Sequence, residues 1–239
     1  EHCQPNILKY SEGILPALYP LLHDPNITVQ VTSCYVLEQF CERLEPKNIR
    51  SSLNALVQKL VQLLSTSQRR SIQEMSVAAL SAVAVAAEEE FSVYLPHIAP
   101  MLLQLIELPI VADTSDQKQN NALRGRALEC FGHMAIACGK SSFSPYFTPV
   151  MKSAAQGLSS EDTDLHEFAY VLFANLAKVM EEEFGPVLPE LVPHLLKVVE
   201  SEDGALEWAE NVSILLYRII FIYNTLLSLW ITYMIYLLT

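Results

Sequence analysis

The sequence contains an eight-residue pattern three times, and this repeat restricts the fold more than any other feature. The pattern L-P-x-[LI]-x-P-x-L begins at Leu15, Leu95 and Leu188. In the last two copies, three glutamates and a phenylalanine come before it, at residues 88–91 and 181–184. Weaker copies near residues 50–57 and 145–152 give a repeating unit of about forty residues, which is typical of HEAT and armadillo repeats.

Each unit has the features expected of two antiparallel helices. The first proline of the pattern fits the opening turn of a helix, and the second removes an intrahelical hydrogen bond and should bend that helix. After the first copy, Asp24-Pro25-Asn26 predicts a tight turn. Apolar residues at helical spacing predict second helices near residues 29–40, 68–87, 119–138 and 163–182. The polar stretch 112–121 predicts a longer loop in the third pair.

These hairpins predict an all-α fold. The chain has only 7 glycines, and no strand-like alternation precedes residue 210. Each hairpin can bury its apolar stripe only against its neighbours, so the stack is the folding unit. We therefore expect a HEAT/armadillo-type superhelical solenoid of antiparallel helix pairs over residues 1–211, with about four full hairpins and the first helix of a fifth. Because the sequence starts at Glu1 in mid-pattern, we expect a segment of a longer protein.

The charge indicates which partners to expect. The chain has 27 acidic and 15 basic residues, a formal net charge of −12. Nucleic-acid binding needs clustered lysine and arginine, so this charge argues against it and favours basic protein partners. The 5 cysteines form no C-x-x-C pair, which indicates a reducing cytosolic or nuclear compartment.

Acidic residues are the candidate binding residues. Glu38, Glu42 and Glu45 are spaced four and three apart, which predicts that they share one face of the first unit's second helix. Two interpretations stay open: an acidic track for lysine- and arginine-rich cargo, or a solvated face that keeps an elongated protein soluble. The same applies to the clusters expected at other helix ends, namely Glu88, Glu89, Glu90, Glu161, Asp162, Asp164, Glu167, Glu181, Glu182 and Glu183.

Signs of catalysis are missing from the sequence. It has no phosphate-binding glycine loop, no G-x-S-x-G and no H-E-x-x-H. Cys130 and His133 have the spacing of half a metal site, but no second pair is placed to complete it. We therefore expect no enzyme, no catalytic residue, no cofactor and no metal.

Several stretches resemble a known family. Residues 22–30 with 35–40 resemble the HEAT pattern, with Gln30 where that pattern usually has arginine, whereas Arg124 keeps it. Residues 78–84, 94–98 and 165–174 resemble the importin-beta (karyopherin-beta) nuclear import receptors of the importin four type. The resemblance extends over about residues 8–205.

This resemblance implies a protein that carries basic cargo, such as histones and ribosomal proteins, into the nucleus under the control of Ran-GTP. It implies that the second helices hold cargo, that the outer helices meet nuclear pore proteins, and that the protein is found in the cytoplasm, the nucleus and the nuclear envelope. The family's Ran contacts lie mainly in N-terminal repeats, so we expect Ran-GTP to bind the full-length receptor rather than this segment. The alternative is a HEAT scaffold or adaptor in another assembly, such as a phosphatase or a vesicle coat.

The C-terminal segment 212–239 differs from the rest of the chain. Residues 219–238 carry no charge and are rich in isoleucine, leucine and tyrosine, and twenty such residues are long enough to span a bilayer. Three explanations stay open: translated non-coding sequence, which we favour, a membrane anchor, and an atypical buried helix. We expect no membrane association unless 219–238 is a genuine anchor.

Overall fold

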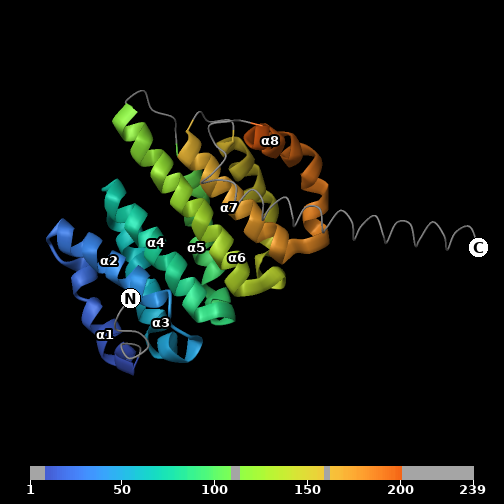
Figure 1. Cartoon of the computed structure of the whole chain (residues 1–239). Helices are drawn as coiled ribbons and strands as arrows, with labels where there is room; N and C mark the ends of the chain where they lie inside the picture. The colour runs from blue at the N-terminus through green and yellow to red at the C-terminus, as the bar shows by residue number, and fades with distance from the viewer. Residues whose placement is uncertain (1–8, 109–113, 159–161, 201–239) are drawn as a thin grey trace, which may run out of the picture. The chain divides into compact units, whose positions relative to one another are not determined.

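The computed structural model describes residues 9–108, 114–158 and 162–200, and all regular elements of these residues are helices (Figure 1). The all-α prediction is confirmed. The chain divides into two compact units, Glu1–Ala169 and Tyr170–Thr239.

The first unit contains successive helix pairs, with 3-10 helices labelled η. In chain order these are α1 (Ser11–Leu18), η2 (Leu21–His23), α2 (Ile27–Cys41), α3 (Pro46–Thr66), α4 (Arg70–Ala87), η3 (Glu88–Tyr94), α5 (Leu95–Ile106), α6 (Thr114–Gly157) and the start of α7 (Thr163–Met180). The second unit contains the remainder of α7, η4 (Glu181–Val187) and α8 (Leu188–Glu200). The predicted second helices correspond to α2, α4, the first part of α6, and α7.

Helix α4 is the centre of the first unit. It packs against α2 and α6, which lie on either side of it, and against its own partner α3 (Figure 1). Every side chain from Ser76 to Ala84 is buried, and the segment is rich in alanine. A helix that is apolar all round has to be covered on all sides, and small side chains allow its neighbours to approach closely. Helices α2, α4 and the first part of α6 thus form an inner layer, with α3 and α5 outside it.

Helix α6 is two helices in sequence. Gly139 has φ 75° and ψ 171°, which interrupts the helical backbone. The residues before Gly139 form the second helix of the third pair, and those after it form the first helix of the fourth. Phe131 and Phe143 lie on opposite sides of this break, are fully buried and contact each other edge to face at 6.3 Å between ring centroids. Their contact joins the two pairs through the core.

The repeated Glu-Glu-Glu-Phe segments have the same conformation in both copies. Glu88 and Glu181 end their helices with φ of 49° and 52°, and the chain then continues as a 3-10 helix. Phe91 and Phe184 are each fully buried. The recurrence of this motif therefore has a structural role, because the phenylalanine anchors each reversal between helices.

The proline predictions hold in part. Pro96 and Pro189 stand at the second residue of α5 and α8, as expected, but Pro16 lies inside α1, which begins earlier, at Ser11. At Pro20 the α-helix has already ended and a 3-10 turn follows. Helices α5 and α8 instead continue past Pro100 and Pro193.

The loop predicted at residues 112–121 is wrong from Thr114 onward, where α6 begins. This stretch is polar but contains neither glycine nor proline, so nothing in it breaks a helix. Asn120 and Asn121 are both buried within the helix. One of these polar side chains serves packing, because the amide of Asn121 donates to the carboxylate of Asp162, directly before α7.

The apolar segment 219–238, the division at residues 211 and 212, and the acidic residue Glu161 involve positions outside the described residues and stay predictions. Among the described helices, none is both long and apolar enough to cross a membrane.

Candidate functional site

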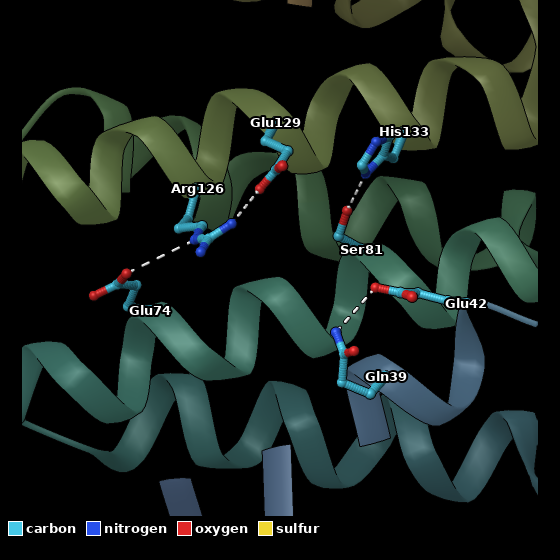
Figure 2. Close-up of polar contacts among 7 residues, drawn as sticks. All are labelled: Gln39, Glu42, Glu74, Ser81, Arg126, Glu129 and His133. Atoms are coloured by element: carbon cyan, nitrogen blue, oxygen red, sulfur yellow. Dashed lines mark hydrogen bonds and ion pairs between the residues drawn. The ribbon is translucent and has the colours of Figure 1, made fainter. Parts of the chain in front are cut away.

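A row of charged side chains crosses the inner layer. It consists of Glu38 on α2, Glu74 on α4, and Arg126 and Glu129 on α6, and is called the inner-face cluster below. Arg126 lies between two carboxylates, with its Nη1 donating a 2.9 Å hydrogen bond to Glu129 and its Nε 3.7 Å from Glu74 (Figure 2). About a third of the side chains of Arg126 and Glu74 and about a quarter of that of Glu129 are exposed. The cluster is therefore within reach of a partner.

The guanidinium of Arg126 is fixed by a third contact. It lies over the ring of Phe168, 5.7 Å from the ring centroid, which is the geometry of a cation–π interaction. Burial lowers the pKa of Arg126, but the hydrogen bond to Glu129 and the charges of Glu129, Glu38 and Glu74 outweigh burial and raise the pKa overall. Arg126 is therefore a permanent cation.

Glu38 is half-buried in this acidic surrounding. Desolvation raises its pKa first of all, the positive charge of Arg126 lowers it, and the carboxylates of Glu129, Glu42 and Glu74 raise it. Glu42 is exposed and accepts a 3.0 Å hydrogen bond from Gln39 (Figure 2). Since the cluster sets three carboxylates against one guanidinium, its net charge is negative.

Further along the same helices, Ser81 Oγ of α4 lies 2.6 Å from His133 Nδ1 of α6 (Figure 2). Burial lowers the pKa of His133, while the charge of Glu129 raises it. Cys130, one turn before His133, is fully buried, and desolvation raises its pKa far above the ordinary value. No group of three metal-ligating side chains occurs within the described ranges. The contact between Ser81 and His133 therefore joins two inner helices, α4 and α6.

At the C-terminal ends of the inner helices lies an open groove of about 630 Å³. Val85 and Ile136, which line it, are about two-fifths exposed. Pro46, Ala87, Glu88, Glu89, Glu90 and Ala137 complete its lining. An apolar floor with acidic side chains beside it suits a partner segment that carries aliphatic and basic residues.

The prediction that Glu38, Glu42 and Glu45 share a helix face is wrong for Glu45. Helix α2 ends at Cys41, so Glu42 is its C-terminal cap, whereas Glu45 precedes α3 and forms a capping box with Asn48. The carboxylate of Glu45 also pairs with Lys47 at 2.6 Å. Of the three, only Glu38 and Glu42 are charged neighbours on the inner layer.

The second predicted cluster is divided between two roles. Glu88 and Glu89 are exposed beside the groove. Glu90 instead accepts two hydrogen bonds from Nε of Arg50, at 2.9 and 3.1 Å, and is committed to an ion pair with α3. In the second unit, Glu181, Glu182 and Glu183 are exposed on η4.

Asp162 has a structural role. Its carboxylate accepts a 3.1 Å hydrogen bond from the backbone N–H of Leu165 in the first turn of α7, and a 2.7 Å bond from the amide of Asn121. Asp164 is exposed and Glu167 is partly exposed on the same helix.

Arg124, the arginine expected from the HEAT pattern, is part of the same network. Its Nη1 donates to Asn121 at 3.1 Å, and its Nη2 donates to the carbonyl of Leu108, just after α5. Arg124 therefore connects the residue after α5 to α6. Asn121 of α6 in turn donates to Asp162, directly before α7.

Sequence reasoning missed Glu74, Arg126, Glu129 and Ser81 as members of the inner surface. The spacing of Arg126 and Glu129, three apart on a predicted helix, was the one local signal of an ion pair. Their approach to Glu38 and Glu74 depends on the packing of three helices, which no local pattern records.

The sequence and the fold are both similar to those of known proteins. Residues 24–110 match the family model described as importin subunit beta-1-like, TPR repeats. The probable importin subunit beta-4 of Schizosaccharomyces pombe is 28% identical over 198 residues, which are 83% of this chain and 18% of that protein. Importin-4 of mouse is 29% identical over 146 residues, 59% of this chain and 12% of the relative. The chain thus spans less than a fifth of the length of these relatives.

Among solved structures, the karyopherin Kap121p superimposes with a TM-score of 0.72 at 24% identity, covering 83% of this chain and 18% of Kap121p. At this identity the match establishes the fold, and the solenoid prediction is confirmed. The resemblance inferred from the sequence is confirmed as well: the chain is homologous to nuclear transport receptors of the importin-beta family, of the importin-4 kind, and has the HEAT-repeat fold of a karyopherin.

Proposed function

We propose that this chain is a protein-binding segment of a nuclear transport receptor, and that its inner layer binds basic segments of cargo proteins. The observation that carries the proposal is the inner-face cluster, in which Glu74 and Glu129 pair with the guanidinium of Arg126, whose charge also acts on Glu38. A lysine or arginine of a partner would be attracted to the excess negative charge there.

Two further observations support this role. The net charge of −12 favours the approach of basic proteins over long distances at low salt. Kap121p, whose fold this chain shares, has been crystallised bound to Pho4p, to Ste12p and to Nup53p. In those complexes a karyopherin is bound to other proteins, which supports binding, and not catalysis, as the work of this chain.

The proposal extends to the whole receptor of which such a segment would be part. We infer that the receptor moves between cytoplasm and nucleus, meets nuclear pore proteins and carries histones or ribosomal proteins. We also infer that Ran-GTP releases its cargo through repeats other than these. A pull-down of Ran-GTP with this chain should accordingly recover none, and recovery would contradict that division of labour.

The test is binding of a lysine-rich histone-tail peptide to the chain, followed by fluorescence anisotropy. We expect the affinity to fall as salt rises from about 50 to 200 mM, because exposed charges are screened over about 10 Å at such ionic strength. The double variant Glu38→Gln/Glu42→Gln removes two inner-layer charges without introducing new ones. It should weaken binding about three- to tenfold.

Glu45→Gln is the matched control. It removes the same charge from a carboxylate that lies at the start of α3 and is already paired with Lys47, so it should leave the affinity unchanged. If the control had half the effect of the double variant on the free energy of binding, each charge would count equally wherever it lies, and only net charge would matter. Binding that ignores salt, or no binding by the folded wild type, would contradict the proposal.

A further inference from the structure

Arg126 occupies the place on the inner surface that would suit a cation from a partner. Its guanidinium lies between Glu74 of α4 and Glu129 of its own helix, and its charge also acts on Glu38 of α2. A basic side chain of a cargo protein would be attracted to these same three carboxylates. The cluster is therefore already occupied by a residue of the chain.

The contacts of Arg126 are unequal in strength. The hydrogen bond to Glu129 is 2.9 Å long, but the distance to Glu74 is 3.7 Å, which is an ion pair without a hydrogen bond. Glu74 is about a third exposed, so its carboxylate keeps contact with water. Because partly exposed ion pairs contribute little to stability, Glu74 can exchange Arg126 for another cation at low cost.

We propose that Arg126 is an internal competitor for the basic side chains of cargo, and that it thereby sets how tightly the inner-face cluster binds them. This inference rests on the proposed function and adds a residue that limits its affinity. A neutral residue at position 126 leaves Glu38, Glu74 and Glu129 without their cation. Those carboxylates then become available to a partner.

A purely structural role for Arg126 makes a different prediction. Its stacking on Phe168 ties α6 to the start of α7, and loss of that contact could loosen the helices and weaken binding. Arg126→Lys separates the two roles, because lysine keeps the positive charge and loses the planar guanidinium that pairs and stacks. Arg126→Gln loses both.

The experiment measures the affinity of the histone-tail peptide for wild type, Arg126→Gln and Arg126→Lys, with circular dichroism to establish that each is folded. We expect Arg126→Gln to bind the peptide about two- to fivefold more tightly, the effect of one added partly exposed ion pair. Arg126→Lys should bind like wild type. Arg126→Gln/Glu74→Gln should lose most of the gain, since it removes a carboxylate that was freed.

Unchanged or weaker binding by folded Arg126→Gln would overturn the inference. An equal gain for Arg126→Lys would overturn it as well, because the cause would then be loosened packing instead of a vacated position.

A cargo-free measurement distinguishes failure of this inference from failure of the proposed function. Millimolar methylguanidinium should raise the melting temperature of Arg126→Ala more than that of wild type, because it can refill the vacated position. Equal shifts would overturn the inference. A larger shift in the variant, with no peptide binding by wild type, would support the role of Arg126 as occupant of the cluster and contradict only the proposed function.

Discussion

The side-chain amide of Asn121 donates a 2.7 Å hydrogen bond to the carboxylate of Asp162, 41 positions later in the chain. Asn121 is buried in α6, and Asp162 also accepts the 3.1 Å bond from the backbone of Leu165. The carboxylate of Asp162 thus caps the N-terminus of α7 and connects this helix to α6, the preceding inner helix. The spacing of this contact is about one HEAT unit, so it connects equivalent parts of successive pairs.

Replacing Asp162 with alanine should lower the free energy of unfolding by about 1–3 kcal/mol, from loss of a helix cap and a buried amide left without its acceptor. Urea unfolding followed by circular dichroism measures this change. Asp164→Ala is the control, since Asp164 is exposed on the same turn and a surface substitution should stay within about 0.5 kcal/mol. Equal losses in both variants would contradict the role of Asp162.

Much of the fold could be predicted because it depends on short-range patterns. The period of the proline-containing octet identified the repeat, and the apolar spacing located α2, α4 and α7 to within a few residues. Helix ends that are not marked by a glycine or a proline were harder to predict from the sequence. No glycine or proline stands between Cys41 and Glu45, so nothing local signalled that α2 ends before Glu45.

The inner-face cluster could not be predicted, because it depends on the register between helices. Glu38, Glu74 and Arg126 are separated by unequal lengths of chain, and a change of one residue in an intervening turn would rotate their faces apart. The acidic runs visible in the sequence were a weaker guide. Glu90 is paired with Arg50, and Asp162 caps a helix.

The break in α6 makes a prediction about Gly139. Its φ of 75° lies in the region that residues with a Cβ rarely adopt, and no atom lies within 4 Å of an added Cβ. Gly139→Ala therefore tests backbone conformation without a steric clash, and should cost about 1–2 kcal/mol of stability. Gly13→Ala, at an equally open site within helix α1, should instead add about 0.5–1 kcal/mol. Thermal unfolding of the two variants checks the opposite signs.

Glu88 is the opposite case to Gly139: here a residue that has a Cβ adopts a positive φ, of 49°. Such strained positions cost about 1–3 kcal/mol, whereas glycine loses about 0.5–1 kcal/mol more backbone entropy on folding. Glu88→Gly should therefore raise the free energy of unfolding by up to about 2.5 kcal/mol, the difference between these two effects. Glu89→Gly, one residue later and without a positive φ, should lower it. A loss of stability in Glu88→Gly as large as that in Glu89→Gly would show that position 88 stores no strain.

His133 predicts a pH dependence of stability. Burial beside Ser81 holds the pKa of this imidazole below its ordinary value, and the negative charge of Glu129 on the same helix opposes this lowering only in part. As the pH falls through about 6.5, the unfolded chain takes up this proton before the folded chain does. The stability contributed by neutral His133 is therefore complete above that pH and is lost below it, by at most about 1.4 kcal/mol per pH unit.

Comparing wild type with His133→Gln isolates this contribution, since glutamine cannot take up a proton and the other titrating groups are common to both proteins. Urea unfolding at pH 8, 7 and 6 should show the wild type losing more stability than the variant, with the difference confined to the steps below pH 7. This range lies above the ordinary titration of carboxylates, so the raised pKa of Glu38, which would act in the opposite direction as the pH falls, contributes little. Parallel curves for the two proteins would mean that His133 is protonated equally in the folded and unfolded chain, and the Ser81 contact would then have no part in excluding the charge.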